Sequence, residues 1–137
     1  MRQSRKEELL RRFPEVPQSM RMKYIIMLTI VVGLAAADFL TGIIKGYLKN
    51  DVSSKIMRRG GLHKIAEIVI MATACGLEVG MTMLGAYYNA DKLADITGTV
   101  TASVVFGYIV IMEIISVLEN YGEINPDAVW VKKLIAR

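Results

Sequence analysis

The chain has 137 residues, of which 53% are hydrophobic and 7% aromatic, with 17 Lys and Arg against 13 Asp and Glu. This length has room for one domain. The charged residues gather in blocks that alternate with long apolar runs, a pattern typical of a small membrane protein with several spans. Despite the net charge of +4, the pattern does not favour a nucleic-acid partner. The alternative, a soluble bundle of hydrophobic helices, is disfavoured by the length of the runs.

Residues able to carry out catalysis or bind a metal are scarce. The one cysteine, Cys75, excludes an intramolecular disulfide, and the one histidine, His63, has no second His or Cys beside it. The sequence contains no nucleophile–base pairing, phosphate-binding loop or metal-ligand spacing. We therefore predict no enzyme activity, no catalytic residue, no metal site and no cofactor.

The basic arm, residues 1–23, holds seven Lys and Arg and three Glu. A capping-box spacing in Ser4-Arg5-Lys6-Glu7 precedes Leu9, Leu10 and Phe13, and prolines follow. The arm is predicted to be either a short amphipathic helix on the membrane surface or a solvated tail.

The first predicted span covers residues 24–44 and contains one charge, Asp38. In a helix, Asp38, Thr41, Gly42 and Lys45 lie near one face and form a polar stripe. Asp38 is expected to pair with Lys45 or with a helix of a neighbouring subunit. Gly33 and Ala37 form a small-residue pair that permits close helix packing.

A basic connector follows over residues 46–64. Ser53 or Ser54 is predicted to cap a short helix, which Gly60-Gly61 would end. Basic side chains such as Lys55 are expected to face anionic lipid headgroups on the cytoplasmic side.

The second predicted span, residues 65–88, is interrupted by Glu67 and Glu78, which are eleven residues apart and share a helix face. Glu67 is near the end of the span and can reach headgroups or Lys64. Glu78 is deep, so it must be protonated, paired across a helix interface or in contact with water. Small residues suited to helix packing lie on another face, at Ala72, Gly76 and Gly80.

A loop at 89–95, without a basic excess, is expected outside the cell, and the third span covers residues 96–118. Thr97, Thr101 and Tyr108 share one face of this span, and Gly98 and Ala102 form another small-residue pair. The cytoplasmic tail, residues 119–137, is predicted to contain an amphipathic helix that starts at Asn125-Pro126 and is anchored by Trp130. The predicted fold is therefore an all-α membrane protein with a transmembrane domain of three helices at 24–118 and short interfacial helices at both ends.

Several short motifs resemble the toxin-secretion/phage-lysis holins over roughly residues 24–126. The first block is Asp38-Phe39-Leu40-Thr41-Gly42 with Lys45, followed by Ser53-Ser54-Lys55 and by Gly60-Gly61-Leu62 with Lys64. The second block is the run from Glu113 through Ser116 to Glu119-Asn120, with Gly122 and Pro126 following. The longer basic arm and the deep Glu78 depart from the family pattern.

The resemblance implies a multi-pass protein of the bacterial inner membrane, encoded by a phage or prophage. It also implies that the protein forms homo-oligomers and opens lesions that release an endolysin, and in some cases a toxin. Under that interpretation Glu67, Glu78 and the Thr97, Thr101 and Tyr108 face are candidate pore-lining or buried polar groups. The alternatives are a small ion- or proton-coupled transporter, an accessory membrane subunit, and an antiholin-type regulator.

The charge distribution conflicts with a simple topology. Three spans with the connector inside place the basic arm outside, although its net charge is +7 − 3 = +4. Moving that charge against an inside-negative potential costs about 9 kcal/mol per 100 mV. We hypothesise that the first span crosses the membrane only when the potential falls. A static arm that violates the charge rule is the alternative.

Overall fold

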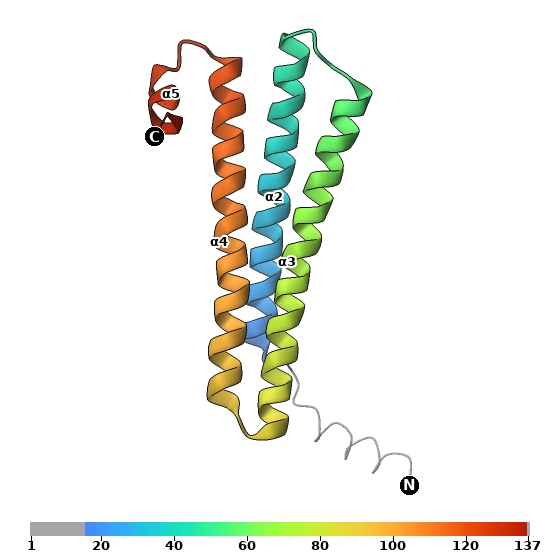
Figure 1. Cartoon of the computed structure of the whole chain (residues 1–137), viewed down its shortest axis with the longest axis vertical. Coiled ribbons are helices and arrows are strands. Elements are labelled where there is room, and N and C mark those ends of the chain that lie inside the picture. Colours follow the sequence, from blue (N-terminus) through green and yellow to red (C-terminus); the bar gives the residue numbers. More distant parts are fainter. Residues whose placement is uncertain (1–15, 137) are drawn as a thin grey trace.

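The structure, a computed structural model of the chain, describes residues 16–136 without the side chains at 91, 93–95 and 97–99. The described residues form an all-helical bundle, in which three long helices run antiparallel to their neighbours in sequence (Figure 1). These are α2 (Gln18–Leu48), α3 (Ser54–Tyr88) and α4 (Asp91–Ile124), and a short helix, α5 (Val129–Ile135), follows. Residues 1–15 of the basic arm lie outside the described residues.

All three long helices are long and apolar enough to cross a membrane. Their 31, 35 and 34 residues correspond to about 46, 52 and 51 Å at the rise of an α-helix, more than the ~30 Å of a hydrocarbon core. Each helix can therefore span the bilayer and extend into the headgroup region. The predicted all-α membrane fold with three transmembrane helices is confirmed.

The surface of the bundle is apolar where a soluble bundle would be polar. Large hydrophobic side chains such as Ile25, Val69 and Val104 are more than half exposed. Leaving such surface in water is unfavourable by about 25 cal/mol per Å², whereas lipid tails accept it. This surface, together with the helix lengths, makes the chain a membrane protein.

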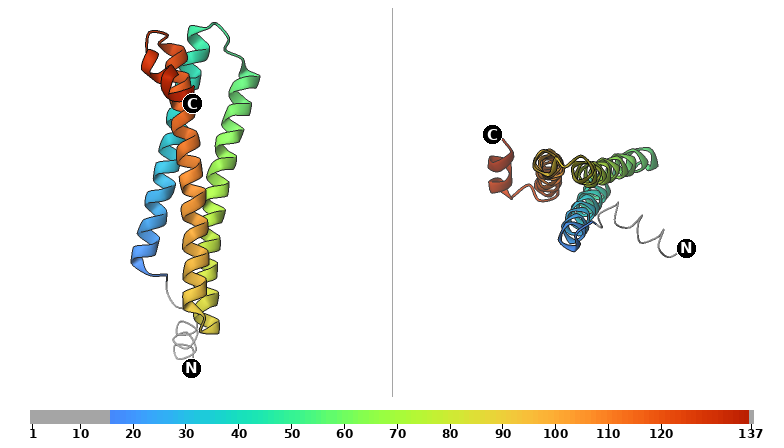
Figure 2. Two further views of the ribbon diagram at one scale, coloured as in Figure 1. Left: turned by 60° about the vertical axis from the view of Figure 1, so that its left-hand side comes forward. Right: turned by 90° about the horizontal axis from the view of Figure 1, so that it is seen from below.

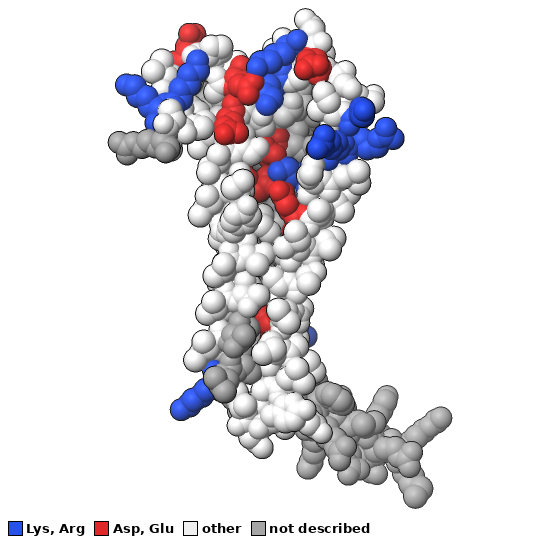
Figure 3. Space-filling view, in the orientation of Figure 1, with Lys and Arg blue, Asp and Glu red and all other residues white. Residues whose placement is uncertain are grey.

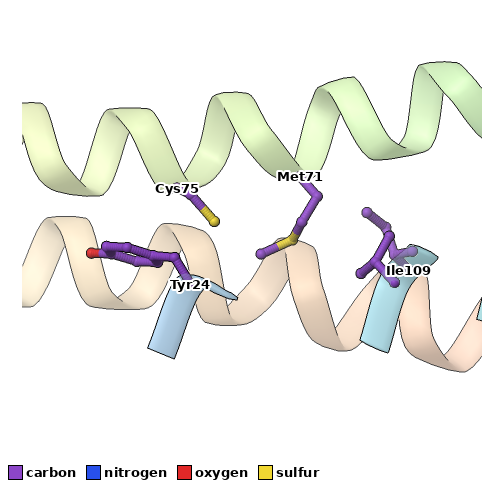
Figure 4. Packing of buried hydrophobic residues seen from close by; sticks show 5 residues of the cluster. Tyr24, Met71, Cys75 and Ile109 are labelled. Atoms are coloured by element: carbon purple, nitrogen blue, oxygen red, sulfur yellow. The ribbon is translucent and has the colours of Figure 1, made fainter. Parts of the chain in front are cut away.

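The interior is small and lies at mid-height. Its buried hydrophobic cluster consists of Tyr24, Val31, Met71, Cys75 and Ile109, contributed by all three long helices. Figure 4 shows Met71 and Cys75 pointing from α3 into the space between the ribbons, where Tyr24 and Ile109 also lie. Since Met71 and Val31 are fully buried, this apolar core closes the middle of the protomer.

The helices differ from the predicted spans at their ends. The connector does not form a separate helix ended by Gly60-Gly61, because α3 runs without interruption from Ser54 through both glycines. A glycine inside a helix costs only about 1 kcal/mol, less than a helix gains in a bilayer by pairing every backbone group. The predicted loop at 89–95 shrinks to Asn89-Ala90, where Asn89 adopts a left-handed conformation with φ 54° and ends α3.

The tail helix begins later than predicted, at Val129 rather than at Asn125-Pro126. It folds back against α4, where Val131 is fully buried and comes within 3.2 Å of the position that a Cβ on Gly122 would occupy. The absence of a side chain at Gly122 therefore allows the close approach of α5. That α5 lies on a membrane surface remains a prediction.

The two ends of the bundle differ. The connector end carries the connection between α2 and α3 and also α5, and the opposite end carries the start of α2 and the turn between α3 and α4 (Figure 1). Both side views show the connector end of α3 leaning away from the other helices (Figures 1 and 2). This divergence opens space between α2 and α3 at that end.

Candidate functional site

Charged side chains gather at the connector end, and some of them lie in a recess between the helices, below which the surface is largely uncharged (Figure 3). The recess leads to a buried group that we call the Lys64 cluster: Lys64, Asp38, Glu67, Glu113 and Asn120. Its members come from α2, α3 and α4. Charged groups at this depth of a membrane helix are costly unless they are paired, so their arrangement carries functional information.

Lys64 is the centre of this cluster. Its Nζ atom lies 2.7 Å from Asp38 Oδ2 on α2, 2.7 Å from Glu113 Oε1 on α4 and 3.4 Å from Glu67 Oε2 on its own helix. An ammonium group has three donor hydrogens, which allows one cation to link all three long helices.

Asn120 completes the link between α2 and α4. Its side-chain amide donates to Asp38 Oδ1 at 2.9 Å and to the Thr41 hydroxyl at 3.3 Å. The Thr41 hydroxyl in turn donates to the backbone carbonyl of Asp38 at 3.0 Å. Both carboxylate oxygens of Asp38 therefore have a partner, one ionic and one neutral.

The charges of the cluster do not balance. One ammonium faces three carboxyl groups, so full ionisation of all three would leave a charge of 1 − 3 = −2. Glu113 is 1% exposed, and its Oε2 atom, like Glu67 Oε2, has no hydrogen-bond partner among the described residues. An excess of buried negative charge makes the loss of Lys64 far more costly than the loss of one carboxylate.

A second buried ion pair lies toward the opposite end. Lys23 Nζ on α2 is 2.8 Å from Oε1 of Glu78 on α3, and Glu78 is completely buried. The same ammonium lies 5.7 Å from the centre of the Tyr24 ring. Of the three options predicted for Glu78, the structure contains pairing across a helix interface.

The two ion-paired sites share one antiparallel register. Lys23 and Asp38 are 15 residues apart on α2, and Lys64 and Glu78 are 14 residues apart on α3. These separations are about 22 and 21 Å at the rise of a helix. The order of charges is positive then negative along α2, and also positive then negative along α3, so the antiparallel arrangement brings opposite charges together at both sites. A parallel arrangement would bring like charges together.

The apolar core separates the two sites. Met71 lies midway between Lys64 and Glu78 on α3, and its neighbours Val31 and Ile109 close the space around it. The described residues therefore form two polar sites about 21 Å apart along α3, without a polar path between them.

A third, more exposed group holds the connector end together. Glu123 at the end of α4 accepts from Lys45, with Nζ 3.5 Å from Oε1, and from Lys49. The expected pairing of Asp38 with Lys45 is thus wrong within the protomer, because Lys64 and Asn120 occupy Asp38 and Glu123 takes Lys45. Solvent-exposed pairs of this kind contribute about 1 kcal/mol or less.

Several residues of the family motif come together although they are far apart in the sequence. Asp38, Thr41, Glu113 and Asn120 meet in or beside the Lys64 cluster. Others line a cavity next to it, namely Gly42, Lys45, Ser53 and Ser116. Three are exposed and lie away from the cluster: Ser54, Lys55 and Glu119.

The predicted helix-packing residues divide into two groups. Ala102 is completely buried inside the bundle, and Ala37 is partly buried. Gly33, Ala72 and Gly76 are exposed, and Gly80 is partly buried. No described atom lies within 4 Å of the position that a Cβ on Gly76 or Gly80 would occupy. The Ala72, Gly76 and Gly80 stripe therefore does not form a close contact within the protomer, and its use in helix packing remains a prediction about other copies. The surroundings of Gly98 lie outside the described side chains.

The candidate polar face of the third span is also divided. Tyr108 is 66% exposed on the outside of the bundle, whereas Glu67 and Glu78 face inward. Thr101 is partly buried, and the side chain of Thr97 is not among those described. Glu67 and Glu78 thus do not share one surface with Tyr108 in this protomer, and a pore-lining role for the five residues remains a prediction.

Sequence reasoning does not select Lys23 and Glu123 as site residues, and it names Lys64 only in a family motif and as a group that Glu67 can reach. Lys64 and Lys23 lie just beyond the ends of the apolar runs, so the pattern places them in the connector and in the basic arm. The nearly equal spacing of opposite charges, 15 residues on α2 and 14 on α3, is the signal that could have identified Lys23 and Lys64.

The comparisons with known proteins agree with this architecture. The sequence profile of the bacteriophage holin family matches residues 19–136, a range that includes nearly all of the four helices in the described part of the chain. No curated protein and no solved structure matches the chain. The matched region contains both buried ion-paired sites and the cavity at the connector end. On this match, which covers most of its length, the chain belongs to the bacteriophage holin family.

Proposed function

We propose that the protein accumulates in the cytoplasmic membrane of the host bacterium, assembles with further copies of itself, and opens lesions that release an endolysin. The observation that supports this function is the placement of charge. The Lys64 cluster and the Lys23–Glu78 pair both face the inside of a protomer whose outer surface is apolar. The closed bundle can therefore exist in lipid, because its polar side chains are buried between the helices and only apolar surface contacts the lipid.

When the bundle opens, its buried polar side chains lose their partners and must contact water instead. Separating α2 from α3 breaks both ion-paired sites, and an isolated charge in hydrocarbon costs at least a few kcal/mol. That cost falls when several protomers open together and their polar faces surround shared water. Lesion formation is then cooperative, because a single open protomer is unfavourable and an assembly of open protomers is not.

Expression in a bacterium together with a muralytic enzyme tests this function. A holin is expected to give an abrupt loss of membrane potential, followed by release of the enzyme and lysis. Glu113→Gln, which alters the buried cluster, should change the time of lysis, and Glu119→Gln on the exposed face of the same helix should not. Expression without loss of potential would contradict the proposal.

The same experiment separates the alternatives. A transporter would leave the cells intact, and an antiholin-type regulator would delay lysis by another holin without making lesions. A proton relay through the carboxyl groups is disfavoured, because the apolar core lies across about 21 Å of helix between the two polar sites. The lesion therefore remains the function that the geometry supports best.

A further inference from the structure

A cavity of about 500 Å³ lies between α2 and α3 at the connector end. One face of α2, which includes Asp38, Gly42 and Lys45, forms one wall. One face of α3, which includes Gly60 and Lys64, forms the opposite wall. The spacings of four, three and four residues place each set on one side of its helix. Two helix faces that point at each other are thus held apart.

The cavity is open to its surroundings, so a space of about 500 Å³ is occupied by solvent or by a ligand. This volume falls within the range of ligand pockets, about 300–1,000 Å³. A Cβ on Gly60 would have no described atom within 4 Å, so this wall has room for a guest.

The lining of the cavity is amphipathic. Phe39, Ile43, Ile56 and Met57 supply apolar surface, and Lys45 and Lys49 line the cavity together with Asp51 and with Glu123, which pairs with both lysines. Each lysine has three donor hydrogens, and Glu123 accepts one bond from each. Their side chains are 30% and 52% exposed, so donors remain for a second acceptor.

The depth of the cavity fits the boundary of a bilayer. Helix α3 exceeds a ~30 Å core by about 22 Å, or about 11 Å at each end, and Lys64 lies ten residues, about 15 Å, from its first residue. The two lysines paired with Glu123 therefore lie at the level of the lipid headgroups, and the floor at Lys64 lies just inside the hydrocarbon. The basic side chains of Lys55, Arg58 and Arg59 on the same end of α3 are exposed and do not line the cavity.

From this arrangement we propose that the cavity binds one anionic glycerophospholipid of the surrounding leaflet. The phosphate lies at Lys45 and Lys49, and the glycerol region lies against the apolar wall. The bound lipid fills the space that keeps α2 and α3 apart at this end. Basic pockets between transmembrane helices are known to receive anionic headgroups.

Native mass spectrometry of the full chain in detergent tests the proposal. The protein is titrated with dioleoyl phosphatidylglycerol, with dioleoyl phosphatidylcholine and with inorganic phosphate. We expect one saturable phosphatidylglycerol adduct, bound about tenfold or more tightly than phosphatidylcholine. Equal binding of the two lipids would overturn the proposal, and displacement of the lipid by inorganic phosphate at equal affinity would identify a free-anion site instead.

Filling the cavity provides a matched pair of variants. Gly60→Leu places a side chain in the cavity and favours the helix, whereas Gly76→Leu adds the same side chain on the exposed face of α3. Gly60→Leu should abolish the saturable adduct and Gly76→Leu should keep it, with unchanged helical content in both. Retention of the adduct by Gly60→Leu would refute the assignment of the site.

Two further variants test the role of charge in opposite directions. Lys45→Ala with Lys49→Ala should weaken binding by about 30-fold. Each lysine is expected to increase the affinity for an anionic headgroup about fivefold, and the two effects multiply. Lys55→Ala with Arg58→Ala, outside the cavity, should change it by less than about threefold. Glu123→Gln removes the competing carboxylate and should tighten binding. Weaker binding by Glu123→Gln would contradict the placement of the phosphate.

Discussion

Lys64 holds three carboxyl groups from three helices, so its replacement is the most direct test of how the bundle is held together. Lys64→Met keeps most of the side-chain volume and removes the ammonium. In the native protein, Asp38 and Glu113 each have a carboxylate oxygen 2.7 Å from Lys64 Nζ. The variant leaves both carboxyl groups without this cation. Removing one partner of a buried pair costs about 3–5 kcal/mol, a large part of a typical stability of about 5–15 kcal/mol.

The free energy of unfolding is measured by titration with sodium dodecyl sulfate in mixed micelles, followed by circular dichroism. We expect a loss of about 3–5 kcal/mol for Lys64→Met. Lys55→Met on the exposed face of the same helix should stay within about 0.5 kcal/mol of the native protein. The control separates the loss of the buried ammonium from the loss of a positive charge as such.

A neutral version of the cluster sharpens the test. Asp38→Asn and Glu113→Gln, combined with Lys64→Met, remove the cation and two of its carboxylates together. Replacing a buried ionic group as a whole is often nearly neutral, so the triple variant should recover most of the lost free energy through coupling between its sites. The reasoning is refuted if Lys64→Met loses less than about 1 kcal/mol, or if the triple variant is no more stable than the single one.

Three further predictions concern other parts of the bundle. Lys23→Ala should destabilise the protein by about 3–5 kcal/mol and Glu78→Gln by less, because only the first leaves a buried carboxylate unpaired. The same detergent titration measures both variants, and equal losses of free energy would contradict this difference. Gly122→Ala should cost about 1–3 kcal/mol by pushing against Val131 and should speed tryptic cleavage within α5, whereas Gly107→Ala, which meets no described neighbour within 4 Å, should not. The basic arm should change sides when the membrane is depolarised, as read by protease accessibility; an arm on the same side in both conditions would refute its movement.

The number and type of the long helices could be predicted from the sequence because lipid leaves few choices. Three apolar runs of the required length, each with only one or two charged residues, determine three spans, and the cost of burying Asp38 and Glu78 implies that each needs a partner. The identity of those partners depends on register and on where each helix ends. The expectation that Gly60-Gly61 ends a helix places Lys64 outside the span and thus hides the centre of the main cluster.

Polar residues on α4 show a second limit. Periodicity groups Glu67 with Glu78 on one face of α3, and in the structure Glu78 is buried and Glu67 is partly buried beside Lys64. It could not decide whether Tyr108 faces the other helices or the lipid, since a tyrosine is stable in either place. The orientation of α4 is set instead by Glu113 and Asn120, whose partners are on other helices.

The ion pairs of α2 also bear on how the basic arm responds to the membrane potential. Withdrawing α2 from the bundle breaks its contacts to Glu78 and Lys64, which costs about 6–10 kcal/mol for two buried pairs. The arm's net charge of +4 contributes about 9 kcal/mol in the opposite direction at 100 mV. The two electrostatic terms are similar in size and opposite in sign, so loss of the potential favours the inserted bundle. Weakening one pair with Glu78→Gln should therefore shift the balance toward the withdrawn arm and delay lysis.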